Sequence, residues 1–239
     1  MTVNATLRSS LFVAGIDEAG RGPLAGPVTA ACVCLPCGYK NPEIRDSKKL
    51  STAKREELFD EILSASLAAA AVSVGPRRIE CLNILGATKL AMQLAAVRVV
   101  GKLRSRYRSA KVYFLVDGNS PLETKLAHET IIKGDQKIQA ISAASIIAKV
   151  TRDRVMDIMS LRYPEYGFLE HKGYGTKFHR LKIAEFGPSR AHRKTFAGVS
   201  EYVFEECKVG EIDIPQTALA NQISPSWAIS DPKSGREAG

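Results

Sequence analysis

Residues 11–28 read LFVAGIDEAGRGPLAGPV, an apolar run that ends on two adjacent acids and continues into a loop rich in Gly and Pro. The apolar part, 11–17, is typical of a short β-strand, and the Gly and Pro residues predict a turn before a second strand at 27–35. Two neighbouring carboxylates beside an apolar strand are costly unless something neutralises them. The stretch therefore predicts paired strands, with Asp17 and Glu18 where the first strand ends.

Strand-like and helix-like segments alternate along the rest of the chain. Further strands are predicted at 67–75, 111–118 and 129–135, and helices at 52–66, 83–107 and 136–163. Ser51 is suited to be the N-cap of the first helix. The expected apolar stripes are Leu58, Ile62 and Leu63 on the first helix, and Ile141, Ala144, Ala148, Val155 and Ile158 on the last. This alternation predicts an α/β sheet with helices packed on it.

The two ends of the chain differ in composition from the part between them. Residues 1–10 are expected to be a flexible lead-in, 11–204 the folded body and 205–239 a flexible tail. From about residue 164 the body becomes basic and glycine-containing, with a short helix expected at 176–186. We therefore expect one folded domain that ends in a C-terminal extension.

Composition narrows the class of protein. The net charge is +9 over 239 residues, and 205–239 hold more acids than bases, so the body carries the positive surplus that attracts polyanions. No uninterrupted apolar run approaches the roughly 20 residues of a membrane span, and no signal peptide is evident. Five irregularly spaced cysteines fit reduced thiols, and the Cys34–Cys37 pair is interpreted as structural. A cytoplasmic location without membrane attachment is expected.

Four acids occupy similar places, at or just beyond the ends of predicted strands. They are Asp17, Glu18, Asp117 and Asp135. Ligand sites of α/β sheets collect at strand ends, and clustered carboxylates need a cation, for which Mg²⁺ or Mn²⁺ is suited. Taken singly, Asp117 with Gly118 could be an ordinary turn, and Asp135 could be an N-cap.

Six motifs, in order, closely resemble bacterial ribonuclease HII. They are GIDEAGRGPLAGPV at 15–28, DSKKL at 46–50, VDG at 116–118, KGDQK at 133–137, SAASIIAKVTRDR at 142–154 and HKGYGT at 171–176. The similarity runs from about Phe12 to Phe196. It implies a ribonuclease H-like mixed sheet flanked by helices, with a C-terminal helical extension.

The resemblance also implies an activity. Members of this family hydrolyse the RNA strand of RNA–DNA hybrids and nick duplex DNA at embedded ribonucleotides, leaving 3′-hydroxyl and 5′-phosphate ends by two-metal-ion catalysis. Carried over to this sequence, the family's metal-binding and catalytic acids are Asp17, Glu18, Asp117 and Asp135. Asp153 is the rival for the fourth place, but its neighbours Arg152 and Arg154 favour a salt-bridged structural role.

The same resemblance implies the substrate contacts. Gly20, Arg21 and Gly22 would recognise the ribonucleotide, and Tyr174 would read its 2′-hydroxyl and stack on the neighbouring sugar. Taken alone, the two glycines could simply form a turn, and Tyr174 could be packed in the interior.

Basic side chains are the expected phosphate contacts. Lys48 and Lys49 belong to DSKKL, and seven further bases follow in the C-terminal segment: Lys172, Lys177, Arg180, Lys182, Arg190, Arg193 and Lys194. A run of this kind can also be a solvated helix face. The histidines at 171, 179 and 192 show no zinc spacing and are interpreted as packing or phosphate contacts.

Two other functions stay open at this point. The chain could be a different nuclease of the same fold, or a non-catalytic basic module that binds nucleic acid through its positive surface. A ribose-sensing loop favours the ribonuclease, because an enzyme that acts on DNA alone does not need one. The expected partners are an RNA–DNA hybrid and duplex DNA containing ribonucleotides, and the expected state is a monomer.

Overall fold

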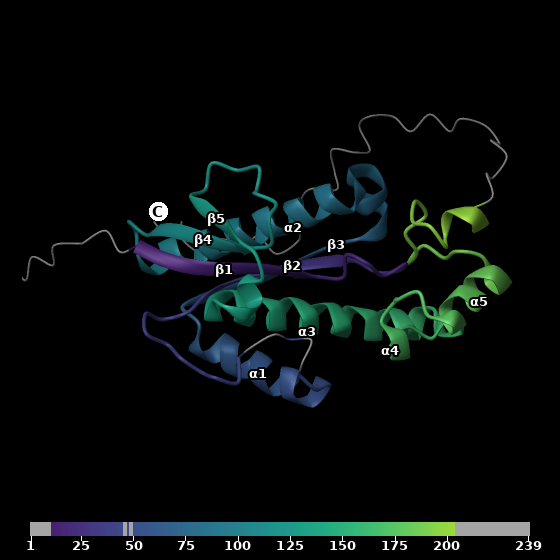
Figure 1. The fold of residues 1–239 in the computed structure, drawn as a ribbon, viewed down its shortest axis with the longest axis horizontal. Coiled ribbons are helices and arrows are strands. Elements are labelled where there is room, and N and C mark those ends of the chain that lie inside the picture. The colour runs from purple at the N-terminus through teal and green to yellow at the C-terminus, as the bar shows by residue number, and fades with distance from the viewer. Residues whose placement is uncertain (1–10, 45–46, 48–49, 204–239) are drawn as a thin grey trace, which may run out of the picture. The chain divides into compact units, whose positions relative to one another are not determined.

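The computed structural model describes residues 11–44, 47 and 50–203, and the part up to Val203 forms one compact unit. Its centre is a five-stranded sheet in the order β3-β2-β1-β4-β5 (Figure 1). The strands are β1 (Leu11–Ala19), β2 (Val28–Cys34), β3 (Ala68–Val74), β4 (Lys111–Asp117) and β5 (His128–Ile131). β1, β2 and β3 pair antiparallel, whereas β4 runs parallel to β1 and β5 parallel to β4. The sheet is therefore mixed, as predicted.

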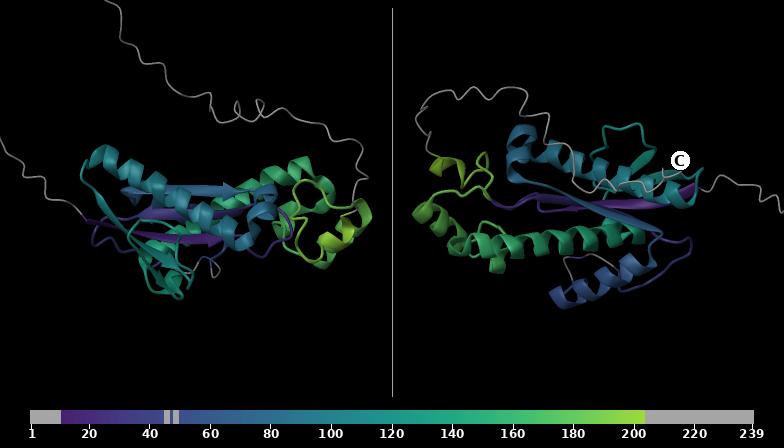
Figure 2. Two further views of the ribbon diagram at one scale, coloured as in Figure 1. Left: turned by 90° about the horizontal axis from the view of Figure 1, so that it is seen from above. Right: turned by 180° about the vertical axis from the view of Figure 1, so that it is seen from behind.

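Helices cover both faces of the sheet. α2 (Pro76–Arg106) lies on one face, and α3 (Gln139–Arg162) with α1 (Thr52–Ala65) lies on the other (Figures 1 and 2). Side chains of a strand alternate between faces, so Ile16 joins the apolar cluster under α2 while Ala31 and Val33 join the cluster under α1 and α3. β2 is buried along its whole length, which agrees with its continuous apolar sequence.

α1 begins where the sequence predicts. The Ser51 hydroxyl accepts a hydrogen bond from the Lys54 amide at 3.2 Å, and Ser51 is the N-cap. Leu58 and Ile62 face the core as expected, but Leu63 is 43% exposed. Phe59 is buried in its place, so the predicted stripe was wrong at one position.

α2 is longer than predicted because it begins at Pro76 rather than at 83. Asn83 interrupts it with a left-handed φ of 56°, and the Asn83 side chain accepts hydrogen bonds from the amides of Leu85 and Gly86, which restarts the helix. By length and composition alone α2 could cross a membrane, although no single apolar run predicted a span. Its buried residues pack on the sheet, as those of many core helices do. The length and composition of α2 are therefore only weak evidence that it spans a membrane.

α3 begins later than predicted and turns a different face inward. Asp135 lies in a short 3₁₀ turn, Gly134–Gln136, and the helix begins at Gln139, so Asp135 is not its N-cap. The early residues of the expected stripe are buried, but Ile158 is 69% exposed. There the helix has passed beyond the sheet, and Arg152 and Met156 face the C-terminal extension instead.

The extension has its own small core. It contains α4 (Phe168–His171), α5 (Lys177–Phe186) and the 3₁₀ turns Pro164–Tyr166 and Ser200–Tyr202. Its apolar residues pack on Met156 of α3 and on Leu24 and Ala25 of the loop that follows β1. The glycine-rich loop is therefore held between the sheet and the extension, and this contact positions the site described below.

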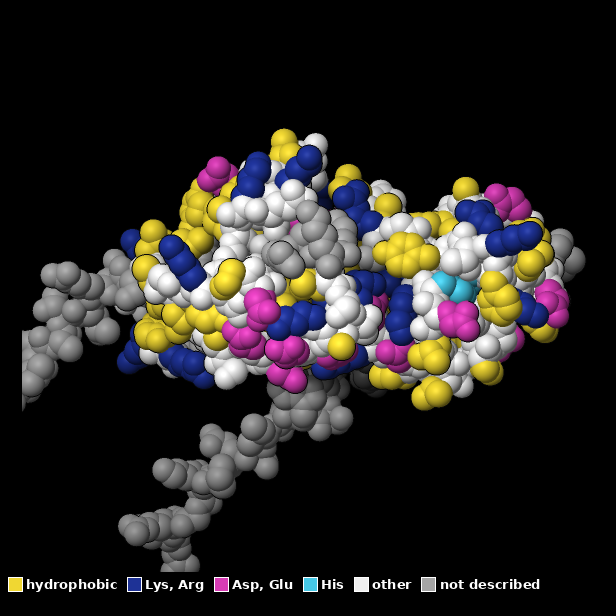
Figure 3. Space-filling view, turned by 60° about the horizontal axis from the view of Figure 1, so that its bottom comes forward, with side chains coloured by type: hydrophobic (Ala, Val, Ile, Leu, Met, Phe, Trp, Pro, Cys, Tyr) yellow, Lys and Arg dark blue, Asp and Glu magenta, His cyan; other side chains and the backbone are white. Residues whose placement is uncertain are grey.

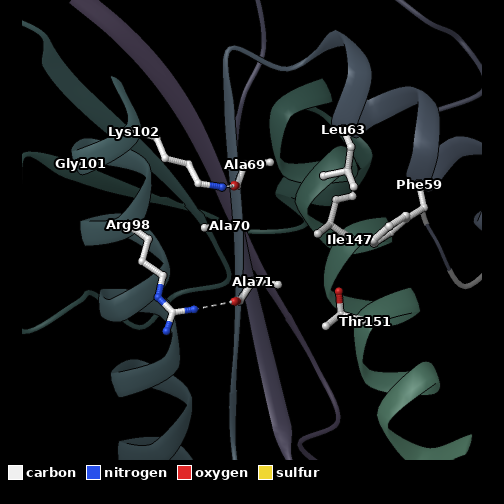
Figure 4. Close-up of a pocket in the computed structure, with 10 residues that line it drawn as sticks. All are labelled: Phe59, Leu63, Ala69, Ala70, Ala71, Arg98, Gly101, Lys102, Ile147 and Thr151. Carbon is white, nitrogen blue, oxygen red and sulfur yellow. Dashed lines mark hydrogen bonds between the residues drawn. The ribbon is translucent and has the colours of Figure 1, made fainter. Parts of the chain in front are cut away.

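The outer edge of β3 is capped by cations from α2. Lys102 donates from Nζ to the Ala69 carbonyl at 2.7 Å, and Arg98 donates from Nη1 to the Ala71 carbonyl at 3.3 Å (Figure 4). These residues are one helical turn apart, and the carbonyls that they reach belong to every second residue of the strand. Charged side chains over an edge strand discourage pairing with another chain.

Candidate active site

A pocket of about 240 Å³ opens at the carboxyl ends of β1 and β4. It collects side chains from both strands, from α3, from the glycine-rich loop and from the extension. Its lining consists of Asp17, Glu18, Ala19, Gly20, Arg21, Ser47, Asp117, Ser145, Lys149 and Tyr174. Three of the four predicted acids and three of the predicted substrate-binding residues thus line one pocket.

The strand register brings the acids together. β1 and β4 are parallel neighbours, with Ile16 opposite Val116, so Asp17 and Asp117 follow at the same end of adjacent strands. Asp117 is tied down because its Oδ1 accepts a hydrogen bond from the Gly134 amide at 2.7 Å. That bond also anchors the turn that carries Asp135, the buried fourth acid. Asp117 is therefore more than a turn residue.

The acids affect one another electrostatically. Burial raises the pKa of Asp17 well above its usual value, and the charges of Glu18, Asp117 and Asp135 raise this pKa further. A hydrogen bond from the Glu18 amide to Asp17 Oδ1, at 2.7 Å, partly opposes this increase. All four carboxylates therefore belong to one cluster, in which burial and the other three charges destabilise the ionised form of Asp17.

The donor set suits a hard divalent cation. Carboxylate oxygens are the ligands that Mg²⁺ and Mn²⁺ prefer, and a bound cation would offset the repulsion in the cluster. Within the described ranges, no three His, Cys, Asp or Glu side chains are already drawn together as closely as metal ligands are. Glu18 instead forms an ion pair with Arg21 at 3.4 Å. The residues fit such an ion chemically, and binding requires their side chains to adjust.

The glycine-rich loop requires glycine at one of its two predicted positions. Gly20 has φ +91°, and a Cβ on it would lie 2.0 Å from Nε of Arg152. A Cβ on Gly22 would meet no atom within 4 Å. The loop therefore approaches Arg152 closely at Gly20, while Gly22 faces open space.

Tyr174 is not packed in the interior. It is 45% exposed and lines the pocket, and its ring centroid lies 5.8 Å from the Arg152 guanidinium carbon and 6.0 Å from Lys149 Nζ. Its backbone is fixed because the carbonyl bonds with His179 Nδ1 at 2.8 Å. The ring is thus presented to the pocket from a rigid loop.

The histidines of the extension form a buried network rather than a surface for phosphates. His192 Nδ1 accepts from the Ser189 amide at 3.0 Å, so its Nε2 carries the proton and donates to His179 Nε2 at 3.0 Å. His179 consequently donates from Nδ1 to the Tyr174 carbonyl. Burial lowers the pKa of His179 to about 4 and that of His192 to about 3. Both rings stay neutral, and together they support the Tyr174 loop.

The predicted lysines have different outcomes. Lys48 and Lys49 lie outside the described residues. The Lys172 ammonium forms an ion pair with Asp157 and lies outside the pocket lining. On the face shown in Figure 3, Lys and Arg side chains lie over both the sheet-bearing part and the extension, mixed with Asp and Glu.

One predicted phosphate contact is contradicted by burial. Arg193 has no exposed surface, and its guanidinium donates to backbone carbonyls, including those of Gly20 and Arg21. A basic residue in a basic segment gave no signal of this, because a buried arginine looks like an exposed one in sequence. Arg193 contacts the loop and not the solvent.

Sequence reasoning also missed the pocket residues that α3 contributes. Lys149 lines the pocket and forms an ion pair with Asp153 at 2.8 Å. Asp153 is thus salt-bridged as expected, although its partner is not a neighbouring arginine. Ser145 also lines the pocket, and its hydroxyl bonds with that of Ser47 at 2.6 Å. The motif around 142–154 contained this signal, since 145 and 149 lie one helical turn apart on α3.

The chain is similar to known ribonucleases over most of its length. The family model for ribonuclease HII matches residues 14–199. A ribonuclease HII from Geotalea uraniireducens is 50% identical over 194 residues, which cover 81% of this chain and 86% of that protein.

Solved structures confirm the predicted ribonuclease H-like fold. The crystal structure of ribonuclease H2 from Pyrococcus horikoshii has a TM-score of 0.62 at 27% identity, covering 80% of this chain and 96% of that one. Bst-RNase HIII in complex with Mn²⁺ shares the fold, with a TM-score of 0.58 at 18% identity over 82% of this chain and 70% of that one. The chain therefore belongs to the ribonuclease HII family, hydrolases that act on the RNA of RNA–DNA hybrids.

Proposed function

We propose that this protein cleaves the RNA strand of hybrids and also nicks duplex DNA at single embedded ribonucleotides, leaving 3′-hydroxyl and 5′-phosphate ends. The observation that carries the proposal is the parallel register of β1 and β4, which places Asp17 beside Asp117 in a pocket that also contains Tyr174. Carboxylates and a sugar-sized aromatic platform in one pocket suit a phosphodiester next to a ribose.

Asp17, Glu18, Asp117 and Asp135 are the residues that would hold Mg²⁺ or Mn²⁺. When bound, divalent cations would activate water and stabilise the charge on the scissile phosphate and the leaving oxygen. The Mn²⁺ complex of the fold neighbour supports a divalent metal here. The parallel strands fix the backbone positions of Asp17 and Asp117, and the Gly134 amide holds the Asp117 carboxylate, so the adjustment that metal binding requires is confined to side chains.

The loop and the tyrosine would provide selectivity for RNA. Gly20 and Arg21 line the pocket, and Gly22 follows them in the same loop without side-chain bulk, which would let amides of the loop reach a 2′-hydroxyl. Tyr174 offers a flat face to the neighbouring sugar and a hydroxyl at its tip. Lys149, in the same pocket, would contact a phosphate oxygen while Asp153, its ion-pair partner, orients its ammonium group.

The decisive experiment compares the protein with Asp117→Asn on three duplexes: one with a single ribonucleotide, a uniform RNA–DNA hybrid and an all-DNA duplex. With Mg²⁺ or Mn²⁺ the wild type should cut the first two and spare the third, and EDTA should stop cleavage. Asp117→Asn should lose about a hundredfold or more in rate, the scale of one preorganised electrostatic group. Asp60→Asn, on the exposed face of α1, is the matched control and should cleave normally.

Other outcomes identify the competing functions. Binding to the hybrid without metal-dependent cleavage would identify a non-catalytic binding module. Cleavage of the all-DNA duplex would identify a nuclease that does not read ribose. Equal cleavage by Asp117→Asn would contradict the assignment of the acid cluster.

A further inference from the structure

Two arginines are buried completely near the pocket, and no described carboxylate forms a salt bridge with either one. Arg152 lies on α3 and Arg193 lies in the segment after α5, and both have 0% exposed surface. Their hydrogen bonds go to backbone carbonyls of the glycine-rich loop and of the Tyr174 loop. These are the two segments that the proposed function assigns to ribose recognition.

Arg193 holds the glycine-rich loop at three points. It donates from Nη2 to the Gly20 carbonyl at 2.5 Å, from Nη1 to the Arg21 carbonyl at 2.8 Å and from Nε to the Gly26 carbonyl at 3.0 Å. In a trans peptide the N–H points opposite to the carbonyl of the same plane. Fixing the first two carbonyls toward Arg193 therefore turns the amides of Arg21 and Gly22 away from it, and no described residue accepts a backbone hydrogen bond from either amide.

Arg152 joins the two loops. It donates from Nε to the Pro27 carbonyl at 3.0 Å and from Nη2 to the Lys172 carbonyl at 2.9 Å, and its guanidinium lies against Tyr174. Its Nη1 is buried without a hydrogen-bond partner among the described residues. One rigid side chain thus contacts the end of the glycine-rich loop, the residue two positions before Tyr174 and the tyrosine ring.

The pair is costly, which argues against a purely stabilising role. Burial lowers the pKa of Arg193 to about 9, with the charge of Arg152 adding to the effect. Buried charges of this kind are often replaceable by apolar residues without loss of stability. A planar guanidinium group, however, can hold two or three carbonyls at once through its several N–H donors. Neither an apolar residue nor a lysine can do this.

We propose that Arg152 and Arg193 are positioning residues for ribose recognition: they fix the outward direction of the Arg21 and Gly22 amides and their distance from the Tyr174 ring. This inference rests on the proposed function. Neither arginine is exposed to the pocket, so each acts through the loops that it holds.

The test measures selectivity rather than activity. Each variant is given duplexes with either a ribonucleotide or a 2′-deoxy-2′-fluoro nucleotide at one position, and kcat/KM is measured for both. Fluorine is a poor acceptor for an amide, so a well-positioned loop discriminates strongly against it. Arg193→Lys keeps the charge but loses the fork, and it should lower the ratio of the two kcat/KM values at least about tenfold. Arg152→Lys should act in the same direction.

The controls separate positioning from folding. Arg154→Lys changes an exposed neighbour on the same helix that pairs with Glu56, and it should keep the wild-type ratio. A merely structural role would slow the cleavage of both substrates equally in the Arg193 and Arg152 variants, leave the ratio unchanged and overturn the inference. If one variant does not fold, the other decides, and failure of both to fold would also overturn it. A wild type without selectivity would overturn the proposed function instead.

Discussion

The four carboxylates near the strand ends and the two buried arginines beside the extension are groups of like charge with different surroundings. On the sheet, burial raises the pKa of Asp17, and the charges of the three other carboxylates raise it further. Beside the extension, Arg152 and Arg193 repel each other in the same manner. Apart from Nη1 of Arg152, the guanidinium nitrogens of both arginines donate to backbone carbonyls, whereas the carboxylates suit an added cation. This difference agrees with the roles that we propose, catalysis for the acids and loop positioning for the arginines.

The largest expected effect separates activity from stability within the acid cluster. Asp17→Asn removes a proposed metal ligand and a buried carboxyl group, so metal-dependent cleavage should fall by about a hundredfold or more. Without divalent metal the same change relieves repulsion, and we expect Tm to rise by about 2–4 °C, the shift that 1 kcal/mol gives in a domain of this size. Activity assays and thermal unfolding in EDTA measure the two effects. A lower Tm would contradict the repulsion described above.

A smaller effect is expected where the loop contacts the arginines. Gly20→Ala places a Cβ against Arg152 at a φ that favours glycine, and it should destabilise the protein by about 1–3 kcal/mol. Gly22→Ala is the matched control and should change the free energy of unfolding by less than about 0.5 kcal/mol, because its Cβ meets open space. Urea unfolding of both variants measures the difference, and equal values would show that Arg152 gives way easily.

A further expected effect concerns pH and the histidines of the extension. The pKa values of His179 and His192 are lowered from 6.5 to about 4 and about 3, by burial first and then by neighbouring cations or histidines. Below pH 6.5 the unfolded chain binds protons that the folded protein excludes, so stability should decline as the pH falls from 6.5 toward 4. It should be insensitive to these two groups above pH 7.

The control for this effect is His192→Asn, which removes one of the two groups. Its stability should decline less between pH 6.5 and pH 4 than that of the wild type. Urea unfolding at several pH values measures both slopes. A wild-type stability that is constant over this interval would show that the rings do not remain neutral in the folded protein.

Part of the architecture could be predicted from the sequence, because strands, helix caps and short helices depend on residues close together in the chain. The five strands, the Ser51 cap and the α5 helix follow from short-range apolar patterning and capping chemistry. One of the failed predictions lies where a helix passes from one environment to another. Ile158 was expected inside and is exposed, because α3 leaves the sheet and presents a different face to the extension.

The residues of the candidate site also fall into those that the sequence indicated and those that only the structure revealed. The sequence alone determined which acids, which loop and which tyrosine to examine, because a pair of adjacent carboxylates after a strand and a motif such as HKGYGT are local features. Only the tertiary structure decided that Asp17 lies beside Asp117, that Lys149 faces the pocket and that Arg193 is buried. Strand order and burial depend on contacts between residues far apart in the chain, and composition and spacing do not encode those contacts individually.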